Sequence, residues 1–223
     1  MDIDSTHQKE SIEKINFFNI ANILTLSRIV LGVVFFILFL ILKILKSELN
    51  YDSEMFLLIT LFLVFVVAII TDALDGFFAR KLNIVTNFGK HFDPLADSIF
   101  FIFVFFSFMI MGIMEWYFFL IIFLREFIMH IFLRPYMKKK GFYLPANIIG
   151  KIKTFLQCIF SFIIILFIII KRILISKNID ISLYNKIISI NSFVFFIIIV
   201  FLSLFSFFIY LGYISKLNKI EKQ

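Results

Sequence analysis

Four aspartates stand close together in the sequence, beside two long apolar segments, and their type and spacing suit chemistry. Asp72 and Asp75 are three positions apart, and Asp93 and Asp97 are four apart. Both spacings place the two carboxylates of a pair on one face of a helix. Four like charges beside apolar segments need a counter-charge, so they hold metal ions or they take up protons. The carboxylates therefore predict a functional site.

The ligand type predicts which ions the site would hold. All four side chains are oxygen donors without a Cys or a clustered His beside them, which favours Mg²⁺ or Mn²⁺ over zinc. Two such ions would neutralise four carboxylates, and Mg²⁺ commonly completes its coordination shell with substrate phosphate. We therefore expect metal-assisted phosphoryl transfer, in which cations hold the phosphates while a base deprotonates an attacking hydroxyl.

Small residues accompany the carboxylates. Gly76 and Ala79 share the helix face of Asp72, and Gly89 precedes Asp93 by one helical turn. Small residues allow two helices to pack closely or leave room for a ligand. Beside four aspartates, we interpret them as the walls of a pocket.

The rest of the chain is typical of an integral membrane protein. Its 223 residues are 62% hydrophobic with a mean hydropathy of +1.05, which excludes a soluble globule. The net charge of +7 indicates basic cytoplasmic loops rather than a nucleic-acid partner. The 35 phenylalanines are interpreted as a compositional bias that lipid-facing helix surface tolerates, with no function of their own, and the single Cys158 excludes an intramolecular disulfide.

Six apolar segments are long enough to span a hydrocarbon core that needs ~20 residues. They are residues 22–45, 55–80, 89–112, 115–137, 147–171 and 187–214. We expect an all-α integral membrane fold: one six-transmembrane-helix bundle over residues 19–215, without internal repeats. A cytoplasmic or interfacial segment, 1–18, would precede it with a short amphipathic helix at 8–18 and no signal peptide. A cytoplasmic tail, 216–223, would follow.

Charge and depth orient the bundle. Six spans place both termini on one side, and the basic residues favour that side as the cytoplasm. Trp116 and Tyr117 then occupy an outer turn, as aromatic belt residues do. Counted from Met55, Asp72 lies ~26 Å along its helix, and Asp93 begins the next span at the same edge. Both carboxylate pairs should therefore meet at the cytoplasmic face of the cell membrane.

The aspartates and their neighbours form the pattern D-x2-D-G-x2-A-R-x8-G-x3-D-x3-D over residues 72–97. This pattern resembles the signature of the CDP-alcohol phosphatidyltransferases at every specified position. Two further stretches resemble the phosphatidylglycerophosphate synthases within that family. They are the N-x-x-N-x-L-T-x-x-R opening at 19–28, with Ala21 where proline is usual, and an R-E stretch followed by Leu133-Arg134, Ala146 and G-K-x-K-T-x-x-Q at 150–157.

The resemblance implies a role for each matching position. Asp72, Asp75, Asp93 and Asp97 would bind two metal ions, and Asp97 would also be the general base. The residues that would border CDP-diacylglycerol are Thr25, Arg28, Asp72, Gly76, Ala79, Arg80, Thr86 and Gly89. The implied reaction is attack by sn-glycerol 3-phosphate on CDP-diacylglycerol, which releases CMP and forms phosphatidylglycerophosphate. The family also implies a homodimer in the bilayer.

The acceptor's phosphate would need cations, and the candidates are Arg125, Arg134, Lys151 and Lys153. Arg134, Lys151 and Lys153 could equally be cytoplasmic anchors. Ser98 stands where phosphatidylglycerophosphate synthases commonly have lysine, a departure that concerns the acceptor rather than the reaction class. Inositol phosphate, serine, choline or phosphatidylglycerol are the alternative acceptors.

A carboxylate-lined cation transporter is the alternative from another class. Transporters place ionisable groups near the bilayer midplane, on broken helices in paired halves. Here the groups cluster at one edge and the chain has no repeat, which favours the enzyme.

Overall fold

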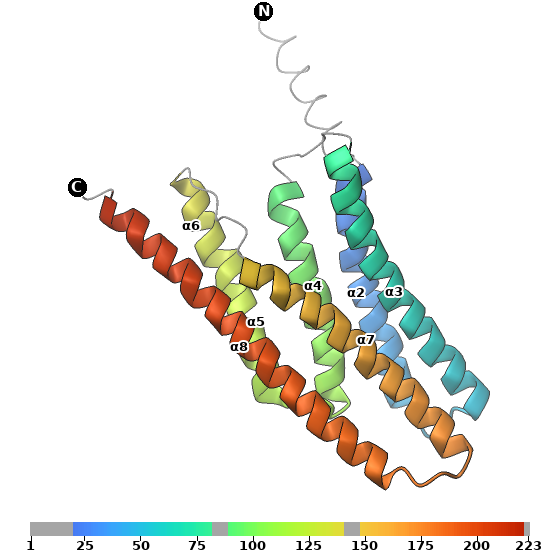
Figure 1. Cartoon of the computed structure of the whole chain (residues 1–223). Coiled ribbons are helices and arrows are strands. Elements are labelled where there is room, and N and C mark those ends of the chain that lie inside the picture. The colour runs from blue at the N-terminus through green and yellow to red at the C-terminus, as the bar shows by residue number, and fades with distance from the viewer. Residues whose placement is uncertain (1–19, 82–88, 141–147, 221–223) are drawn as a thin grey trace, which may run out of the picture.

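Six long apolar helices make up most of the protein in the computed structural model (Figure 1). The structure describes residues 20–81, 89–140 and 148–220, apart from the side chains of residues 20–22, 24, 75–81, 89–92 and 218–220. Every regular element within these described ranges is a helix, which confirms the predicted all-α, six-span architecture. A bilayer-spanning backbone must satisfy its own hydrogen bonds, and a helix does so within one segment. The chain is a multi-pass membrane protein.

The helices follow one another with short connections. In order they are α2 (Ile20–Ile44), α3 (Tyr51–Lys81), α4 (Gly89–Ile110), α5 (Trp116–Ile128), a π-helical turn η1 (Met129–Leu133), α6 (Arg134–Lys139), α7 (Ile148–Ser176) and α8 (Ser182–Ile220). Together, α5, η1 and α6 form a single span. The predicted amphipathic helix at 8–18 lies outside the described residues.

The connection between the last two helices is shorter than the sequence predicts. The predicted loop covers residues 172–186, but α7 continues to Ser176 and α8 begins at Ser182. Asn178 adopts a left-handed conformation with φ of 54°, and its N–H donates to the carbonyl of Ile175. The next N–H, of Ile179, donates to the carbonyl of Leu174. This helix cap reverses the chain within a few residues, so no long loop is needed.

Phenylalanine rings fill the middle of the bundle. Phe35, Phe65 and Phe100 are at most 1% exposed, and the ring centroids of Phe65 and Phe100 lie 5.8 Å apart. Helix α2 packs against α3 and α4, whereas α7 packs against α3 and α8. The sequence interpretation gave the phenylalanines no particular place, beyond noting that lipid-facing surface tolerates them, and the structure places these rings between helices. Composition alone does not distinguish a lipid-facing apolar side chain from one between helices.

Helices α2 and α4 run in the same direction in a constant register. Thr25 contacts Asp93, and Arg28 contacts Asp97, at sequence separations of 68 and 69. Gly32, one turn beyond Arg28, packs on Phe100, where an added Cβ would lie 3.3 Å from the Phe100 Cα. The missing side chain at Gly32 therefore lets the two helices approach closely enough for the polar residues above it to meet.

We expect Gly32→Leu to lower the free energy of unfolding by about 1–3 kcal/mol, because the larger side chain overpacks the contact between α2 and α4. Gly212→Leu is the matched control, since a Cβ there meets nothing within 4 Å and both changes gain the same helix propensity. Thermal unfolding in detergent micelles measures the difference. Equal melting temperatures for the two variants would contradict this account of Gly32.

Candidate active site

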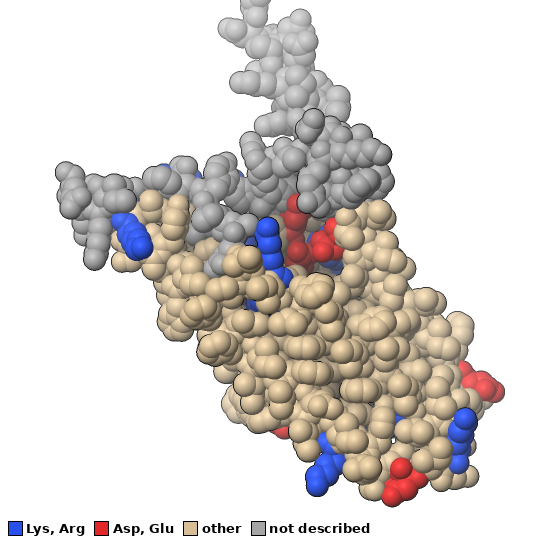
Figure 2. Space-filling view, viewed as in Figure 1, with Lys and Arg blue, Asp and Glu red and all other residues tan. Residues whose placement is uncertain are grey.

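The described aspartates gather at the end of the bundle where α3 finishes and α4 begins. Asp72 lies 21 residues into α3, about 31 Å along it at 1.5 Å per residue. Asp93 and Asp97 occupy the first turns of α4. Figure 2 shows acidic and basic side chains toward this upper end of the molecule, above a long surface with few charges. The two helices thus bring their carboxylates to one depth, as the sequence predicts.

Among the described side chains, Arg28 is a cation that pairs with these carboxylates. Its guanidinium Nη2 lies 2.9 Å from Asp72 Oδ1, and its Nη1 pairs with Asp97 Oδ1. The Arg28 side chain is 2% exposed, whereas those of Asp72 and Asp97 are 50% and 28% exposed. One turn earlier on α2, the Thr25 hydroxyl donates to Asp93 Oδ1 at 2.7 Å. Helix α2 therefore supplies a polar partner to each of the three carboxylates.

The structure brings together five of the residues that the sequence assigned to the metals and the nucleotide. These are Thr25, Arg28, Asp72, Asp93 and Asp97. The family resemblance implies that Thr25 and Arg28 contact the nucleotide, whereas in the structure they contact the carboxylates. The remaining candidates have no described side chain: Asp75, Gly76, Ala79 and Arg80 lie on α3, Gly89 begins α4, and Thr86 is outside the described residues.

The donor set fits a hard divalent cation. Within the described part of the chain, no three Asp, Glu, His or Cys side chains converge to enclose an ion. The described carboxylates nevertheless offer oxygen ligands from both α3 and α4, since Asp72 and Asp97 contact the same Arg28 side chain and Asp72 is half-exposed. Oxygen-only ligands of this kind suit Mg²⁺ or Mn²⁺.

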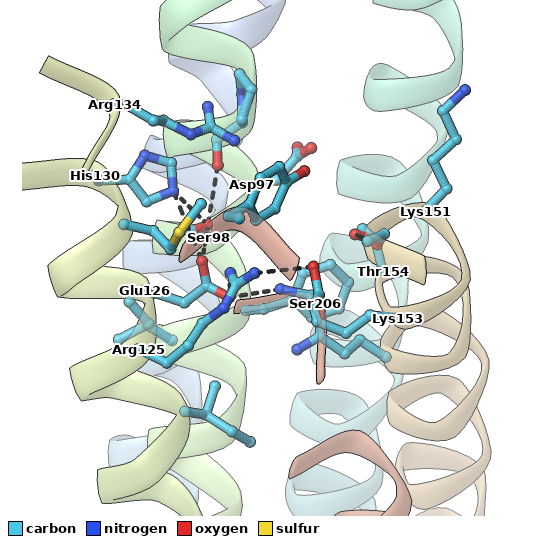
Figure 3. Close-up of a pocket in the computed structure, with 18 residues that line it drawn as sticks. Asp97, Ser98, Arg125, Glu126, His130, Arg134, Lys151, Lys153, Thr154 and Ser206 are labelled. Carbon is cyan, nitrogen blue, oxygen red and sulfur yellow. Dashed lines mark hydrogen bonds and ion pairs between the residues drawn. The ribbon is translucent and has the colours of Figure 1, made fainter. Parts of the chain in front are cut away.

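A second polar cluster lies deeper, centred on Glu126 of α5. Glu126 Oε1 accepts a hydrogen bond from Arg125 Nη1 at 2.8 Å and another from Lys153 Nζ of α7 at 2.5 Å. The Glu126 side chain is 5% exposed, and both cations are buried as well. Arg125 also donates to the Ser206 hydroxyl of α8 at 3.4 Å. Buried charges need partners, and this network links α5, α7 and α8 (Figure 3).

A cavity of about 190 Å³ connects the two clusters. Asp97 and Ser98 of α4 line it together with Glu126, His130 and Arg134 (Figure 3). Its wall also includes Gly150, Lys151, Lys153, Thr154, Gln157, Ser206 and Tyr210. Four cations and two carboxylates face this space, so it favours an anionic ligand.

All four predicted acceptor-phosphate residues line this cavity, but their surroundings differ. Arg125 and Lys153 are committed to Glu126. Lys151 is exposed, and Arg134 begins α6 at intermediate exposure. Arg134 and Lys151 are therefore better placed to meet an entering anion.

Sequence reasoning missed His130, Ser206 and Tyr210 as lining residues and missed the central position of Glu126. A spacing of four between Glu126, His130 and Arg134 was the available signal. In a regular α-helix, eight residues overshoot two turns by roughly 80°. The wider π-helical turn over Met129–Leu133 takes up part of this excess, so Glu126 and Arg134 line the same cavity.

Known proteins resemble this chain over most of its length. The profile of the CDP-alcohol phosphatidyltransferase family matches residues 18–216. Relatives named CDP-diacylglycerol–glycerol-3-phosphate 3-phosphatidyltransferase occur in several bacteria. The Bacillus subtilis protein is 36% identical over 143 residues, which are 64% of this chain and 74% of the relative.

Two further relatives carry the same name. The Rickettsia typhi protein is 36% identical over 148 residues, or 66% of this chain and 76% of the relative. The Mycoplasma pneumoniae protein is 41% identical over 95 residues, or 43% of this chain and 41% of the relative. The chain therefore spans less than half the length of the Mycoplasma relative and about three quarters of the other two.

We expect Glu126→Gln to destabilise the protein by about 3–5 kcal/mol, because it leaves two buried cations without their carboxylate. The double variant Glu126→Gln/Lys153→Met removes one of those cations and should recover part of the loss. Thermal unfolding in detergent compares them with Glu48→Gln, an exposed control in the turn before α3. A Glu126→Gln protein as stable as this control would contradict the role of Glu126 as the centre of the network.

Proposed function

This chain belongs to the CDP-alcohol phosphatidyltransferase family, and on that premise we propose that it transfers the phosphatidyl group of CDP-diacylglycerol to sn-glycerol 3-phosphate. The products are phosphatidylglycerophosphate and CMP, and the reaction belongs to phospholipid biosynthesis. The observation that carries the proposal is the motif of residues 72–97 beside a cation-lined cavity. The names of the relatives support the same donor and acceptor.

The donor would bind at the aspartate cluster. Asp72, Asp75, Asp93 and Asp97 would hold two Mg²⁺ or Mn²⁺ ions. Such ions, when bound, neutralise the diphosphate and polarise the phosphorus under attack. The surrounding residues would border the cytidine diphosphate: Thr25, Arg28, Gly76, Ala79, Arg80, Thr86 and Gly89.

Asp97 would act as the general base. It takes the proton from the primary hydroxyl of the acceptor, and the hydroxyl oxygen forms a bond to the phosphorus that carries diacylglycerol. The bond from that phosphorus to the bridging oxygen of CMP breaks, and CMP leaves with the electron pair. Asp97 suits this role because it belongs to the aspartate cluster, where the donor would bind, and also lines the cavity, where the acceptor would bind.

The cavity would bind the acceptor. Arg134 and Lys151 would take its phosphate, because Arg125 and Lys153 already pair with Glu126. The Glu126 network would instead keep those two buried cations and their helices in place. In this division, Arg125 and Lys153 raise the positive potential of the cavity without a direct bond to the phosphate.

The substrates also suggest an orientation. A lipid donor reaches the site from the bilayer and a soluble acceptor reaches it from water, so the active site would lie at the cytoplasmic face of the cell membrane. Both termini would lie on that side, in agreement with the bias of basic residues. We also propose a homodimer, by family resemblance.

The acceptor is tested with purified protein, CDP-diacylglycerol and Mg²⁺ or Mn²⁺. We expect CMP release with sn-glycerol 3-phosphate and little with inositol phosphate, serine, choline or phosphatidylglycerol, and we expect excess chelator to stop it. Release with another alcohol but not with glycerol phosphate would overturn the acceptor and keep the reaction class. No release with any acceptor would overturn the proposed activity.

Asp97→Asn should lower the rate of CMP release at least about 100-fold, because the amide cannot take up the proton. Asp52→Asn, an exposed change at the opposite end of α3, should leave the rate unchanged. Thermal unfolding checks that both variants are folded. Turnover of the folded Asp97→Asn protein within a few-fold of the wild type would remove Asp97 as the base.

A further inference from the structure

The hydroxyl of Ser98 has three polar neighbours. Its oxygen lies 2.9 Å from the carbonyl of Pro94, 2.9 Å from Glu126 Oε2 and 2.9 Å from His130 Nε2. Ser98 directly follows Asp97 on α4, whereas His130 lies in the π-helical turn that follows α5. The Ser98 hydroxyl therefore connects α4, which carries the proposed base Asp97, to the π-helical turn that directly precedes Arg134.

Counting protons assigns the direction of these bonds. Ser98 has one hydroxyl proton, and both the Pro94 carbonyl and the Glu126 carboxylate can only accept. The proton therefore goes to one of those two. With the proton on one of those two acceptors, His130 Nε2 contacts the Ser98 oxygen favourably only when its N–H donates, so we assign the imidazole hydrogen to Nε2. In the neutral ring, Nδ1 is then a hydrogen-bond acceptor.

The Nδ1 atom is available to a ligand. No hydrogen bond joins it to another residue in the part of the chain that the structure describes, and the ring lines the 190 Å³ cavity. In Figure 3 the ring lies between Ser98 and Arg134. Four cationic side chains already line this space, so the uncharged ring is the form that adds no repulsion. The cavity thus contains cations for a phosphate and, at His130 Nδ1, a neutral acceptor without a proton of its own.

We propose that His130 Nδ1 accepts a hydrogen bond from the second hydroxyl of the acceptor, the one that does not attack. This inference rests on the proposed function. In sn-glycerol 3-phosphate that hydroxyl stands between the phosphate and the attacking hydroxyl. His130 likewise lies between Arg134, which would hold the phosphate, and Ser98, the neighbour of the base Asp97. His130 is a specificity residue in this reading, and Ser98 is a positioning residue that orients its ring.

The same contacts explain why a serine stands at position 98, where the phosphatidylglycerophosphate synthases that this chain resembles commonly have lysine. A lysine ammonium can only donate, and it would add a fifth cation beside Arg125, Arg134, Lys151 and Lys153. Serine adds no charge, and its hydroxyl contacts the imidazole of His130, which also lines the cavity. The site would then recognise a hydroxyl through an acceptor atom rather than a phosphate through a further charge.

The test compares two acceptors that differ by one hydroxyl. 3-Hydroxypropyl phosphate keeps the phosphate and the attacking hydroxyl of sn-glycerol 3-phosphate and lacks the second hydroxyl. We expect the wild-type protein to prefer sn-glycerol 3-phosphate by about 10-fold in kcat/KM, the size of one hydrogen bond. Equal kcat/KM for the two acceptors in the wild type would overturn the inference and leave the proposed function intact.

Matched substitutions locate the preference on Nδ1. His130→Asn places an amide oxygen near the position of Nδ1 and should retain most of the preference. His130→Gln reaches toward Ser98 and lacks an acceptor at Nδ1, so its preference should fall below about 2-fold, chiefly through a higher KM for sn-glycerol 3-phosphate. Ser176→Ala, at the far end of α7, is the control and should behave as the wild type.

The outcomes separate a specific role from a structural one. A merely structural His130 would lower activity toward both acceptors equally in both variants, and that result would overturn the inference. If neither His130 variant folds, Ser98→Ala decides: the preference should fall several-fold because the ring loses its anchor, and an unchanged preference would overturn the inference. Absence of CMP release by the wild type with either acceptor would instead contradict the proposed function.

Discussion

The buried guanidinium of Arg28 between the carboxylates of α3 and α4 is the interaction on which the upper end of the bundle depends. It pairs with both Asp72 and Asp97, and because the guanidinium itself is buried, its charge would be costly without them. It also requires α2 and α4 to lie close together, which Gly32 permits one turn further along. Helix packing and charge compensation are therefore one constraint: if α2 moves away, the carboxylates lose their counter-charge. A site for diphosphate and metal needs such a preset cluster of acids.

The second constraint is the Glu126 network, which places three further helices around the cavity. Glu126 joins α5 to α7 through Lys153, and Arg125 reaches Ser206 on α8. Without Glu126, the buried cations Arg125 and Lys153 would repel each other, and with it both line the cavity. The cavity borders the aspartate cluster through Asp97. Donor and acceptor would thus meet at Asp97, which belongs to the aspartate cluster and also lines the cavity.

Several features of this arrangement were predictable because they follow from local pattern. Runs of about 20 apolar residues predict spanning helices, and the described structure has six. The spacing of Asp72, Asp93 and Asp97 predicts shared depth, and the structure confirms that depth for these three. The ends of the helices were less predictable. The connection between α7 and α8 is shorter than expected, because the left-handed conformation of the single residue Asn178 ends α7 and redirects the chain. The least predictable feature was which of the four candidate cations Arg125, Arg134, Lys151 and Lys153 pair with Glu126, because they look alike in sequence.

The sequence by itself determined the membrane fold, the family and the identity of the acidic residues, since apolar length, residue type and short-range spacing are all local properties. Only the tertiary structure decided which cationic side chain pairs with which carboxylate. In the structure, Arg28 pairs with Asp72 and Asp97. Arg125 and Lys153 pair with Glu126. His130 contacts Ser98 and lines the cavity. Pairing between charges on different helices depends on how those helices approach and rotate, and a π-helical turn changes that rotation in the middle of a span. The four carboxylates could therefore be found by reading the chain, while the partners of the described ones and the wall of the cavity became visible only from the packing of the helices.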